Sequence, residues 1–245
     1  VDMGWLKRQR VLVEGNQDPV VEAYKLLRTH IIQRTKAENK NVLMITGSQH
    51  GEGKTLTAVN LALSLSQEVD RTVLLVDADL RHPAVHTCLG IRPEAGLVDY
   101  LRRNKAIPEL LLNPQGFPKF VILPGGRPVT EAAELLSSPM MAELVKELKH
   151  FYPDRYVIFD LPPVLSYADA LAFAPLADGI ILVVEEKRTS RKDLAKCLEL
   201  LRDFPLLGTV LNKAEDLPTH YYYRRGSGGG GRASWLRRLR DLVGL

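Results

Sequence analysis

A glycine-rich segment near the start of the chain constrains its fold more than any other feature. The run Ser48-Gln49-His50-Gly51-Glu52-Gly53-Lys54-Thr55 follows an apolar stretch and precedes an amphipathic one. Such a strand–loop–helix unit wraps backbone N–H groups around phosphates, while its lysine reaches the outer phosphates and its hydroxyl ligates Mg²⁺. The sequence therefore predicts a nucleotide-binding P-loop. Its expected cofactor-binding residues are Gly51, Glu52, Gly53, Lys54, Thr55 and Leu56.

The rest of the chain alternates apolar runs rich in β-branched residues with amphipathic stretches. This alternation is typical of an α/β fold, a parallel β-sheet flanked by crossover helices. The expected strands lie at 41–46, 72–77, 120–123, 156–160, 179–184 and 208–212, and the expected helices at 20–35, 54–67, 97–104, 140–150 and 191–204. Because the strands are almost continuously apolar, all six are expected to be buried on both faces.

Length and charge predict one domain with a distinct tail. The 245 residues fit an N-terminal segment (1–17), one P-loop domain (18–216) and a tail (217–245). The tail holds six arginines and one aspartate and so carries a charge of +5. Because the whole chain has a net charge of +4, the remainder is slightly acidic. We therefore expect no nucleic-acid partner. No apolar run reaches the roughly 18 residues of a membrane span and no leader is evident, which favours a cytoplasmic location.

Three aspartates follow expected strands at their carboxyl ends. Asp77 and Asp79 come after the run at 72–77, and Asp160 ends the run at 156–160. Acids at strand ends are often turn formers or helix caps, but the carboxyl edge of such a sheet is also where ligands bind. Three acids beside a phosphate loop favour a site. The predicted Mg²⁺ ligands are Thr55, Asp77, Asp79 and Asp160, with ATP phosphates and water completing the shell.

The segment Asn212-Lys213-Ala214-Glu215 follows the last expected strand. It nearly matches the guanine-reading pattern Asn-Lys-x-Asp, but Glu215 stands in place of the aspartate, which favours ATP over GTP. Asn212 is expected either to contact the edge of the base or to form a turn at the strand end.

The tail combines tyrosines, a glycine-rich linker and a basic amphipathic segment. Tyr221, Tyr222 and Tyr223 precede the linker at 226–231, whose composition is that of a flexible tether. In the segment 234–245, large apolar residues share one helical face and arginines the other. This segment is expected either to contact an anionic membrane peripherally or to be a disordered or partner-bound tail.

Taken together, these segments resemble the bacterial tyrosine kinases (BY-kinases) and the related ATPases of capsule and exopolysaccharide synthesis, which are P-loop proteins of the deviant Walker type. The resemblance covers roughly residues 18–212. The family's motif of apolar residues followed by DxDxR matches Asp77, Asp79 and Arg81, and a further motif matches Asp160. Its ExxRxxR helix, which packs subunits into a ring, is similar to the segment with Glu22, Lys25 and Arg28, although Lys25 replaces an arginine.

The resemblance implies an ATP-dependent tyrosine autokinase that regulates capsule or exopolysaccharide synthesis. Its catalytic residues would be Lys54, Asp77, Asp79, Arg81 and Asp160, with Asp77 or Asp79 helping to deprotonate a tyrosine hydroxyl. The phosphoacceptors would be Tyr221, Tyr222 and Tyr223 of a neighbouring subunit in a homo-oligomer. A membrane polysaccharide co-polymerase would activate the kinase through its cytoplasmic end, so the kinase would lie peripherally at the inner face of the cell membrane.

Other classes of protein share parts of this pattern. A P-loop ATPase of polysaccharide export would use the same site without a tyrosine acceptor. A membrane-cycling or partitioning ATPase would carry a second lysine at the position of Gln49, and its absence disfavours that class. A non-catalytic adaptor is disfavoured by three acids beside an intact Lys54.

Overall fold

The computed structural model describes residues 2–12, 18–38, 40–151 and 154–215. The chain divides into two units, Val1–Glu215 and Asp216–Leu245, of which the first is compact. The tyrosines at 221–223, the linker and the segment 234–245 lie outside the described residues. The first unit contains the P-loop and all three acidic motif residues.

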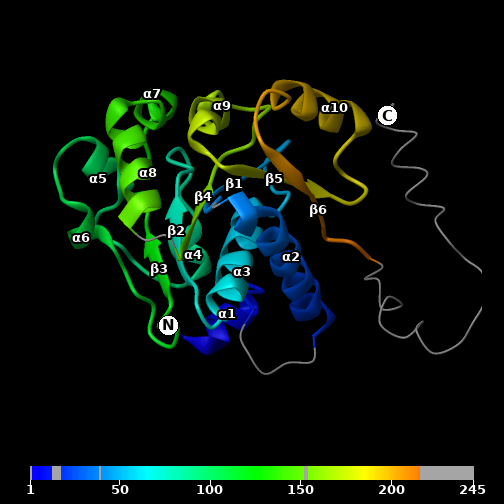
Figure 1. The fold of residues 1–245 in the computed structure, drawn as a ribbon, viewed down its shortest axis with the longest axis horizontal. Coiled ribbons are helices and arrows are strands. Elements are labelled where there is room, and N and C mark those ends of the chain that lie inside the picture. Colours follow the sequence, from blue (N-terminus) through cyan, green and yellow to red (C-terminus); the bar gives the residue numbers. More distant parts are fainter. Residues whose placement is uncertain (1, 13–17, 39, 152–153, 216–245) are drawn as a thin grey trace, which may run out of the picture. The chain divides into compact units, whose positions relative to one another are not determined.

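The first unit is an α/β domain built on one parallel sheet with the order β3-β2-β4-β1-β5-β6 (Figure 1). Its strands are β1 (Val42–Gly47), β2 (Thr72–Asp77), β3 (Phe120–Leu123), β4 (Arg155–Asp160), β5 (Gly179–Glu185) and β6 (Leu206–Asn212). Its helices are α1 (Met3–Arg8), α2 (Pro19–Thr35), α3 (Lys54–Ser66), α4 (Val85–Cys88), α5 (Leu97–Leu101), α6 (Ile107–Leu110), α7 (Ala132–Leu136), α8 (Pro139–Phe151), α9 (Asp169–Phe173) and α10 (Arg191–Leu200), with 3-10 turns η1 (Lys36–Glu38) and η2 (Ala174–Leu176). The predicted fold class is confirmed.

The sheet is covered on both faces, because alternate residues of each inner strand enter opposite cores. In β1, Val42 and Met44 pack with residues of α5 to α10 in one core, whereas Leu43 and Ile45 pack with residues of α1 to α4 in the other. All four side chains are fully buried. Figure 1 shows α2 and α3 together over the second face. This two-sided burial explains why the inner strands are continuously apolar.

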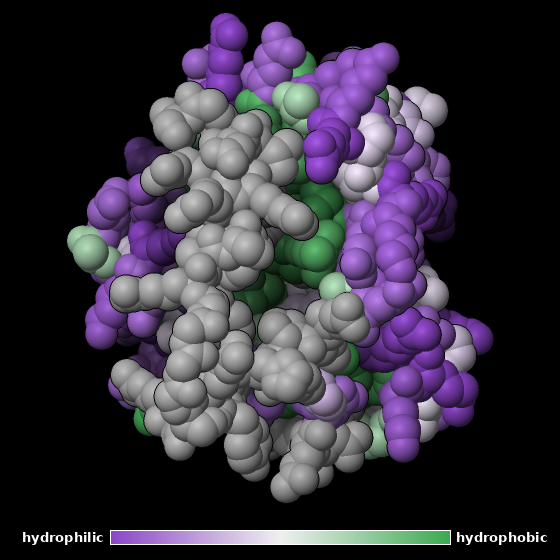
Figure 2. All heavy atoms as spheres, turned by 90° about the vertical axis from the view of Figure 1, so that its right-hand side faces the viewer, coloured by the Kyte–Doolittle hydropathy of each residue, from purple (hydrophilic) through white to green (hydrophobic). Residues whose placement is uncertain are grey.

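Strand β6 differs from the prediction of burial on both faces. It forms an edge of the sheet and pairs with β5 alone among the described strands. Leu206 and Leu211 are 36% and 57% exposed, and Leu200 of the neighbouring α10 is 43% exposed. Figure 2 views the molecule from this side and shows apolar surface with polar surface to its right. The prediction was wrong because an apolar run shows that a strand forms but does not show its place in the strand order.

The N-terminal residues 2–12 pack on the P-loop domain. Leu6 of α1 is fully buried in the core that contains α3. The side chain of Asn60, on α3, accepts the Leu12 N–H at 2.9 Å and donates to the Arg10 carbonyl at 3.2 Å. The indole of Trp5 donates to the Thr87 carbonyl at 3.1 Å. Helix α1 was not predicted, since its six residues carry too few apolar positions to show a helical period.

The topology places the P-loop in the middle of the sheet. It leaves the carboxyl end of β1, which lies between β4 and β5. The acids at the ends of β2 and β4 meet at the same edge, where α/β sheets bind ligands. No helix in the described ranges combines the length and the apolar character that a bilayer crossing requires.

Candidate active site

The P-loop between β1 and α3 takes a shape that favours glycine at two positions. Gly51 and Gly53 have φ angles of 82° and 88°, in the left-handed region that other residues adopt at a cost. A Cβ at Gly53 would also collide with the side-chain amide of Asn212. Helix α3 starts at Lys54, directly after this turn. The free N–H groups and the positive end of the helix dipole at such an N-terminus favour a bound phosphate.

Glu52 holds the start of the loop in place from inside. Its carboxylate accepts the N–H groups of Ser48 and Gln49 at 2.7 and 2.9 Å. It also accepts the hydroxyl of Ser48 and, at 2.6 Å, that of Thr189 in the segment before α10. The side chain is buried. The structure therefore gives Glu52 a part in shaping the phosphate cradle, and its carboxylate is occupied by protein donors.

Residues after β6 support the loop from outside. The side-chain amide of Asn212 donates to the Glu52 carbonyl at 2.8 Å, and the Lys213 ammonium donates to the Gly51 carbonyl at the same distance. Glu185 lies 3.0 Å from the Lys213 ammonium and completes this contact. Asn212 therefore links the end of β6 to the P-loop through its side chain.

Lys54 is the positive centre of the site. Its side chain is almost buried, and its ammonium donates to the Gln49 carbonyl at 2.8 Å. Burial lowers the pKa of Lys54, and the carboxylates of Asp160, Glu52 and Asp79 offset part of that effect. Three carboxyl groups therefore surround one buried ammonium, and this arrangement suits a site that also accommodates a cation and phosphates.

The three motif aspartates converge as predicted. Strands β2 and β4 are neighbours, and Asp77 and Asp160 are register partners at their last paired position. Asp77, Asp160 and Asp79 are 0%, 1% and 8% exposed. Burial raises the pKa of each, that of Asp160 to about 7, where the nearby Thr55 side chain offsets part of the effect. Repulsion from Asp160 raises the pKa of Asp77 further.

Several oxygens of these acids have no protein partner. One oxygen of Asp77 accepts the N–H groups of Ala84 and Val85 at 2.9 and 3.0 Å, and Asp79 accepts the His82 N–H at 3.0 Å. The other oxygen of Asp77 and both oxygens of Asp160 are buried and unsatisfied among the described residues. Buried carboxylate oxygens without donors fit a hard cation.

The protein ligands would not surround such a cation completely. Among the described residues, no group of three histidine, cysteine, aspartate or glutamate side chains forms a self-contained metal site. Mg²⁺ differs from other cations in this respect, because it keeps several waters and takes further oxygens from substrate phosphates. The arrangement therefore fits a Mg²⁺ that arrives with a nucleotide.

Arg81, the last residue of the DxDxR motif, is anchored within the fold. Its Nε and Nη2 donate to the two carboxylate oxygens of Asp169 at 2.7 and 3.0 Å, and Asp169 is fully buried at the start of α9. The guanidinium lies 4.7 Å from the centroid of the Tyr167 ring. A paired arginine of this kind fixes the loop after Asp79 to α9, so its contribution to catalysis would be positional.

Comparison with known proteins identifies the family. A family model described as an AAA domain matches residues 40–209. The tyrosine-protein kinase YwqD of Bacillus subtilis (strain 168) is 37% identical over 193 residues, which cover 78% of this chain and 80% of YwqD. This chain belongs to the BY-kinase family.

Two further matches extend this result. The VpsO kinase domain superposes with a TM-score of 0.71 at 28% identity and covers 80% of this BY-kinase and 96% of the VpsO chain. The succinoglycan biosynthesis transport protein ExoP of Rhizobium meliloti (strain 1021) is 33% identical over 218 residues. That match covers 87% of this chain but 27% of ExoP. The family and the P-loop geometry make this chain a nucleotide-binding protein.

In this BY-kinase the residues expected to join subunits also make contacts within one chain. Lys25 pairs with Glu22 on the same face of α2 at 2.7 Å. Arg28 pairs with Glu68 at 2.8 Å and donates to the Ser64 carbonyl of α3 at 2.8 Å, and its side chain is 16% exposed. Arg28 therefore fixes α2 to α3, while Glu22 and Lys25 remain accessible for an oligomeric contact.

The structure adds residues that the sequence did not identify. Asp169 holds Arg81, Thr189 holds Glu52, and an aromatic cluster of His50, His82 and Tyr167 lies beside Asp79. Their partners are distant in sequence, so no local pattern links them. The one sequence signal was the position of His50 inside the P-loop, next to the predicted site.

Proposed function

We propose that this chain transfers the γ-phosphate of ATP to Tyr221, Tyr222 and Tyr223 of a neighbouring copy and so regulates capsule or exopolysaccharide synthesis. The observation that carries the proposal is the group of three buried acids beside Lys54, with carboxylate oxygens that no described donor satisfies. Membership of the BY-kinase family supports the same reaction. The raised pKa values of Asp77, Asp79 and Asp160 also support a catalytic site, because strongly perturbed pKa values cluster at functional sites.

The residues of the P-loop and the acidic loops have separate roles in the proposed reaction. Lys54 and the helix N-terminus bind the outer phosphates, and Thr55, Asp77 and Asp160 would hold Mg²⁺. When bound, the ion supplies positive charge that neutralises the phosphate oxygens. Asp79 is the least buried of the three acids, at 8% exposed, so we assign to its carboxylate the role of accepting the proton of the acceptor tyrosine.

The proposed chemistry is a simple exchange of bonds. The bond between the γ-phosphorus and its bridging oxygen breaks, and a bond forms between that phosphorus and the tyrosine oxygen. The tyrosine proton passes to the Asp79 carboxylate and then to water, and ADP leaves. Positioning and charge account for most of the rate in reactions of this kind, so an acceptor needs access to the site more than a fold of its own.

Replacing all three tail tyrosines with phenylalanine tests this function. We expect wild-type protein incubated with Mg²⁺ and γ-labelled ATP to incorporate label as phosphotyrosine, and the Tyr221/Tyr222/Tyr223→Phe chain to lose nearly all of it. Hydrolysis of ATP by the variant reports whether its site remains intact. Labelling that persists in the triple variant would contradict the assignment of the acceptors, and ATP hydrolysis without phosphotyrosine in wild type would favour the plain ATPase.

The partner proposed here follows from the match to ExoP. The shared region covers 27% of ExoP, a succinoglycan biosynthesis transport protein. The polysaccharide synthesis or export that the kinase regulates would therefore be carried out by a membrane protein equivalent to the remainder of ExoP. We propose that this partner, a polysaccharide co-polymerase joined to the kinase or separate from it, activates the kinase at the cytoplasmic face of the membrane. The kinase itself would be a homo-oligomer in contact through α2.

The basic segment 234–245 is proposed to add weak membrane affinity. Each arginine near an anionic surface contributes roughly 1 kcal/mol, and an apolar stripe adds to this by insertion at the interface. Sedimentation with anionic liposomes should therefore recover more full-length protein than protein ending at Gly231, and neutral liposomes should recover both equally. Equal recovery of the two proteins with anionic liposomes would contradict this role.

A further inference from the structure

The segment between β5 and α10 brings an arginine against the P-loop. Its backbone turns at Lys187, which has a φ angle of 62°, and the next residue is Arg188. A Cβ placed on Gly51 would lie 2.8 Å from the Nη1 atom of Arg188 and 3.6 Å from its Cζ atom. The guanidinium therefore lies directly beside the middle of the loop that is expected to enclose the phosphates.

The backbone at Arg188 is fixed to the P-loop by the residue that follows it. The hydroxyl of Thr189 donates to the buried Glu52 carboxylate at 2.6 Å and accepts the Glu185 N–H at 2.9 Å. The next residue, Ser190, caps α10. The Arg188 side chain, by contrast, is 49% exposed. The segment thus combines an anchored backbone with a side chain that has room to turn.

Most hydrogen-bond donors of this guanidinium are unused. Nη1 of Arg188 pairs with the Glu185 carboxylate at 3.1 Å, but no hydrogen bond or ion pair with a described residue engages Nε or Nη2. Glu185 also holds the Lys213 ammonium at 3.0 Å, so its carboxylate keeps a positive partner if Arg188 turns away. The planar fork of an arginine matches the geometry of phosphate oxygens.

The charge of Arg188 also acts on the lysine of the P-loop. Burial lowers the pKa of Lys54, and the positive charge of Arg188 lowers it further. Two cations that repel each other across a phosphate loop favour an anion between them. A bound polyphosphate would therefore relieve a repulsion that exists in the free site.

A pocket of about 490 Å³ adjoins this arginine. Arg188 lines it together with Ser48, Gln49 and His50, the first residues of the P-loop. The volume is within the range of pockets that bind small ligands. The side chain can therefore turn along the loop within this space without displacing a neighbouring element.

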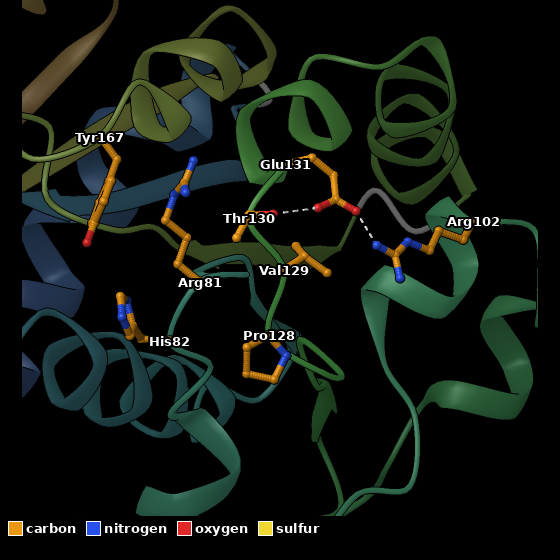
Figure 3. Close-up of a pocket in the computed structure, with 8 residues that line it drawn as sticks. All are labelled: Arg81, His82, Arg102, Pro128, Val129, Thr130, Glu131 and Tyr167. Atoms are coloured by element: carbon orange, nitrogen blue, oxygen red, sulfur yellow. Dashed lines mark hydrogen bonds and ion pairs between the residues drawn. The ribbon is translucent and has the colours of Figure 1, made fainter.

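Two other arginines near the acidic loop are already engaged. Figure 3 shows a pocket beside this loop in which Arg102 is directed toward Glu131, with which it forms an ion pair. Arg81 uses both Nε and Nη2 for the carboxylate of Asp169. Of these three arginines, Arg188 is the one that keeps donors free beside the P-loop.

We propose that Arg188 is a catalytic residue, whose free Nε and Nη2 donors bind oxygens of the β- and γ-phosphates of ATP. The inference rests on the proposed phosphoryl transfer and adds one group to it. As the bond between the γ-phosphorus and the bridging oxygen breaks, negative charge grows on that oxygen, and the guanidinium stabilises it. Arginines that act on the transferred phosphate in other P-loop proteins contribute roughly 10³- to 10⁵-fold to the rate.

The test compares three full-length variants with wild type. Arg188→Ala removes the guanidinium, and Arg188→Lys keeps the charge without the fork. Arg191→Ala, at an exposed arginine at the start of α10, is the matched control. Initial rates of tyrosine labelling and of ATP hydrolysis, measured against ATP concentration with Mg²⁺, give kcat and KM. Titration with a fluorescent ADP analogue gives the affinity for product and shows that each variant is folded.

The expected losses lie in kcat. Arg188→Ala should lower kcat for labelling and for hydrolysis roughly 10²-fold or more. The KM for ATP and the affinity for ADP should stay within about threefold, because the contact strengthens as the transition state forms. Arg188→Lys should remain at least about tenfold below wild type, since an ammonium cannot replace the fork. Arg191→Ala should stay within about twofold.

Three results would overturn the inference. They are a kcat of Arg188→Ala within about threefold of wild type, full recovery in Arg188→Lys, and a loss of ADP affinity as large as the loss in kcat. Full recovery by lysine would mean that the ion pair with Glu185 accounts for the effect. Hydrolysis of ATP by wild type without phosphotyrosine would overturn the kinase function instead, and the effect of Arg188 on hydrolysis would still decide its role.

Discussion

Replacing Lys54 with methionine is expected to reduce phosphoryl transfer roughly 10²- to 10³-fold, the loss seen when one preorganised charge or donor is removed from a transition state. Its ammonium is buried between Asp160, Glu52 and Asp79 and has one described hydrogen bond, to the Gln49 carbonyl. A methionine at this position supplies neither the charge nor the hydrogen-bond donors of the ammonium. The measurement is the initial rate of tyrosine labelling, with Mg²⁺ and ATP near saturation.

The control for this experiment is Lys192→Met, at an exposed lysine of α10. The same chemical change there should leave the rate within about twofold, as surface substitutions usually do. Nucleotide affinity, measured by titration with a fluorescent ATP analogue, separates binding from transfer. A Lys54→Met chain that retains more than a tenth of the wild-type transfer rate would contradict the role assigned to this side chain.

Replacing Asp160 with asparagine is expected to have opposite effects on activity and stability. Activity should fall roughly 10²-fold or more, because a ligand for Mg²⁺ is lost. Without Mg²⁺ and nucleotide, however, the variant should be more stable than wild type at pH 8. The carboxylate of Asp160 is buried with both oxygens unpartnered, and this burial is the cause of its pKa of about 7.

The sign of the pH dependence follows from proton binding. Between about pH 4 and pH 7 the folded wild type holds a proton on Asp160 that the unfolded chain has already lost, so the free energy of unfolding falls as pH rises. At 1.36 kcal/mol per pKa unit the full shift amounts to about 4 kcal/mol, and coupling to Asp77 spreads it over both groups. The stability advantage of Asp160→Asn should therefore grow by about 2 kcal/mol from pH 5 to pH 8.

Denaturant unfolding at the two pH values, with and without Mg²⁺ and nucleotide, measures this effect. Asp203→Asn, at an exposed aspartate beside Arg202, is the control and should show no growth in stability between pH 5 and pH 8. Adding Mg²⁺ together with nucleotide at pH 8 should stabilise wild type more than Asp160→Asn. An advantage of Asp160→Asn that shrinks as pH rises would mean that the buried carboxylate is not held at a raised pKa.

The parts of the site that could be predicted from the sequence are those that depend on residues close together in the chain. Asp77 and Asp160 end apolar runs that form parallel strands, and parallel strands bring their carboxyl ends to one edge. The bounds of β2 and β3 agree with the expected ranges because their apolar runs stop abruptly. Lys54 begins α3 because the glycines before it require a turn.

The parts that could not be predicted depend on contacts between distant segments. Glu52 meets Thr189 137 residues away, Arg81 meets Asp169 across 88 residues, and Asn212 reaches back 160 residues to the P-loop. The edge position of β6 likewise depends on the order of all six strands. Short helices such as α4 and α9 have too few residues to show a period, although α9 positions the carboxylate that anchors Arg81.

The central claim, transfer of phosphate to the tail tyrosines, is tested most directly by locating the product. Cleavage by trypsin after Lys213 and Arg224 releases the peptide 214–224, which contains Tyr221, Tyr222 and Tyr223. After incubation with Mg²⁺ and ATP, mass spectrometry of wild-type protein should find this peptide carrying one or more phosphoryl groups on tyrosine, and the Lys54→Met chain should yield it unmodified. An unmodified peptide from wild-type protein that has hydrolysed ATP would contradict the claim.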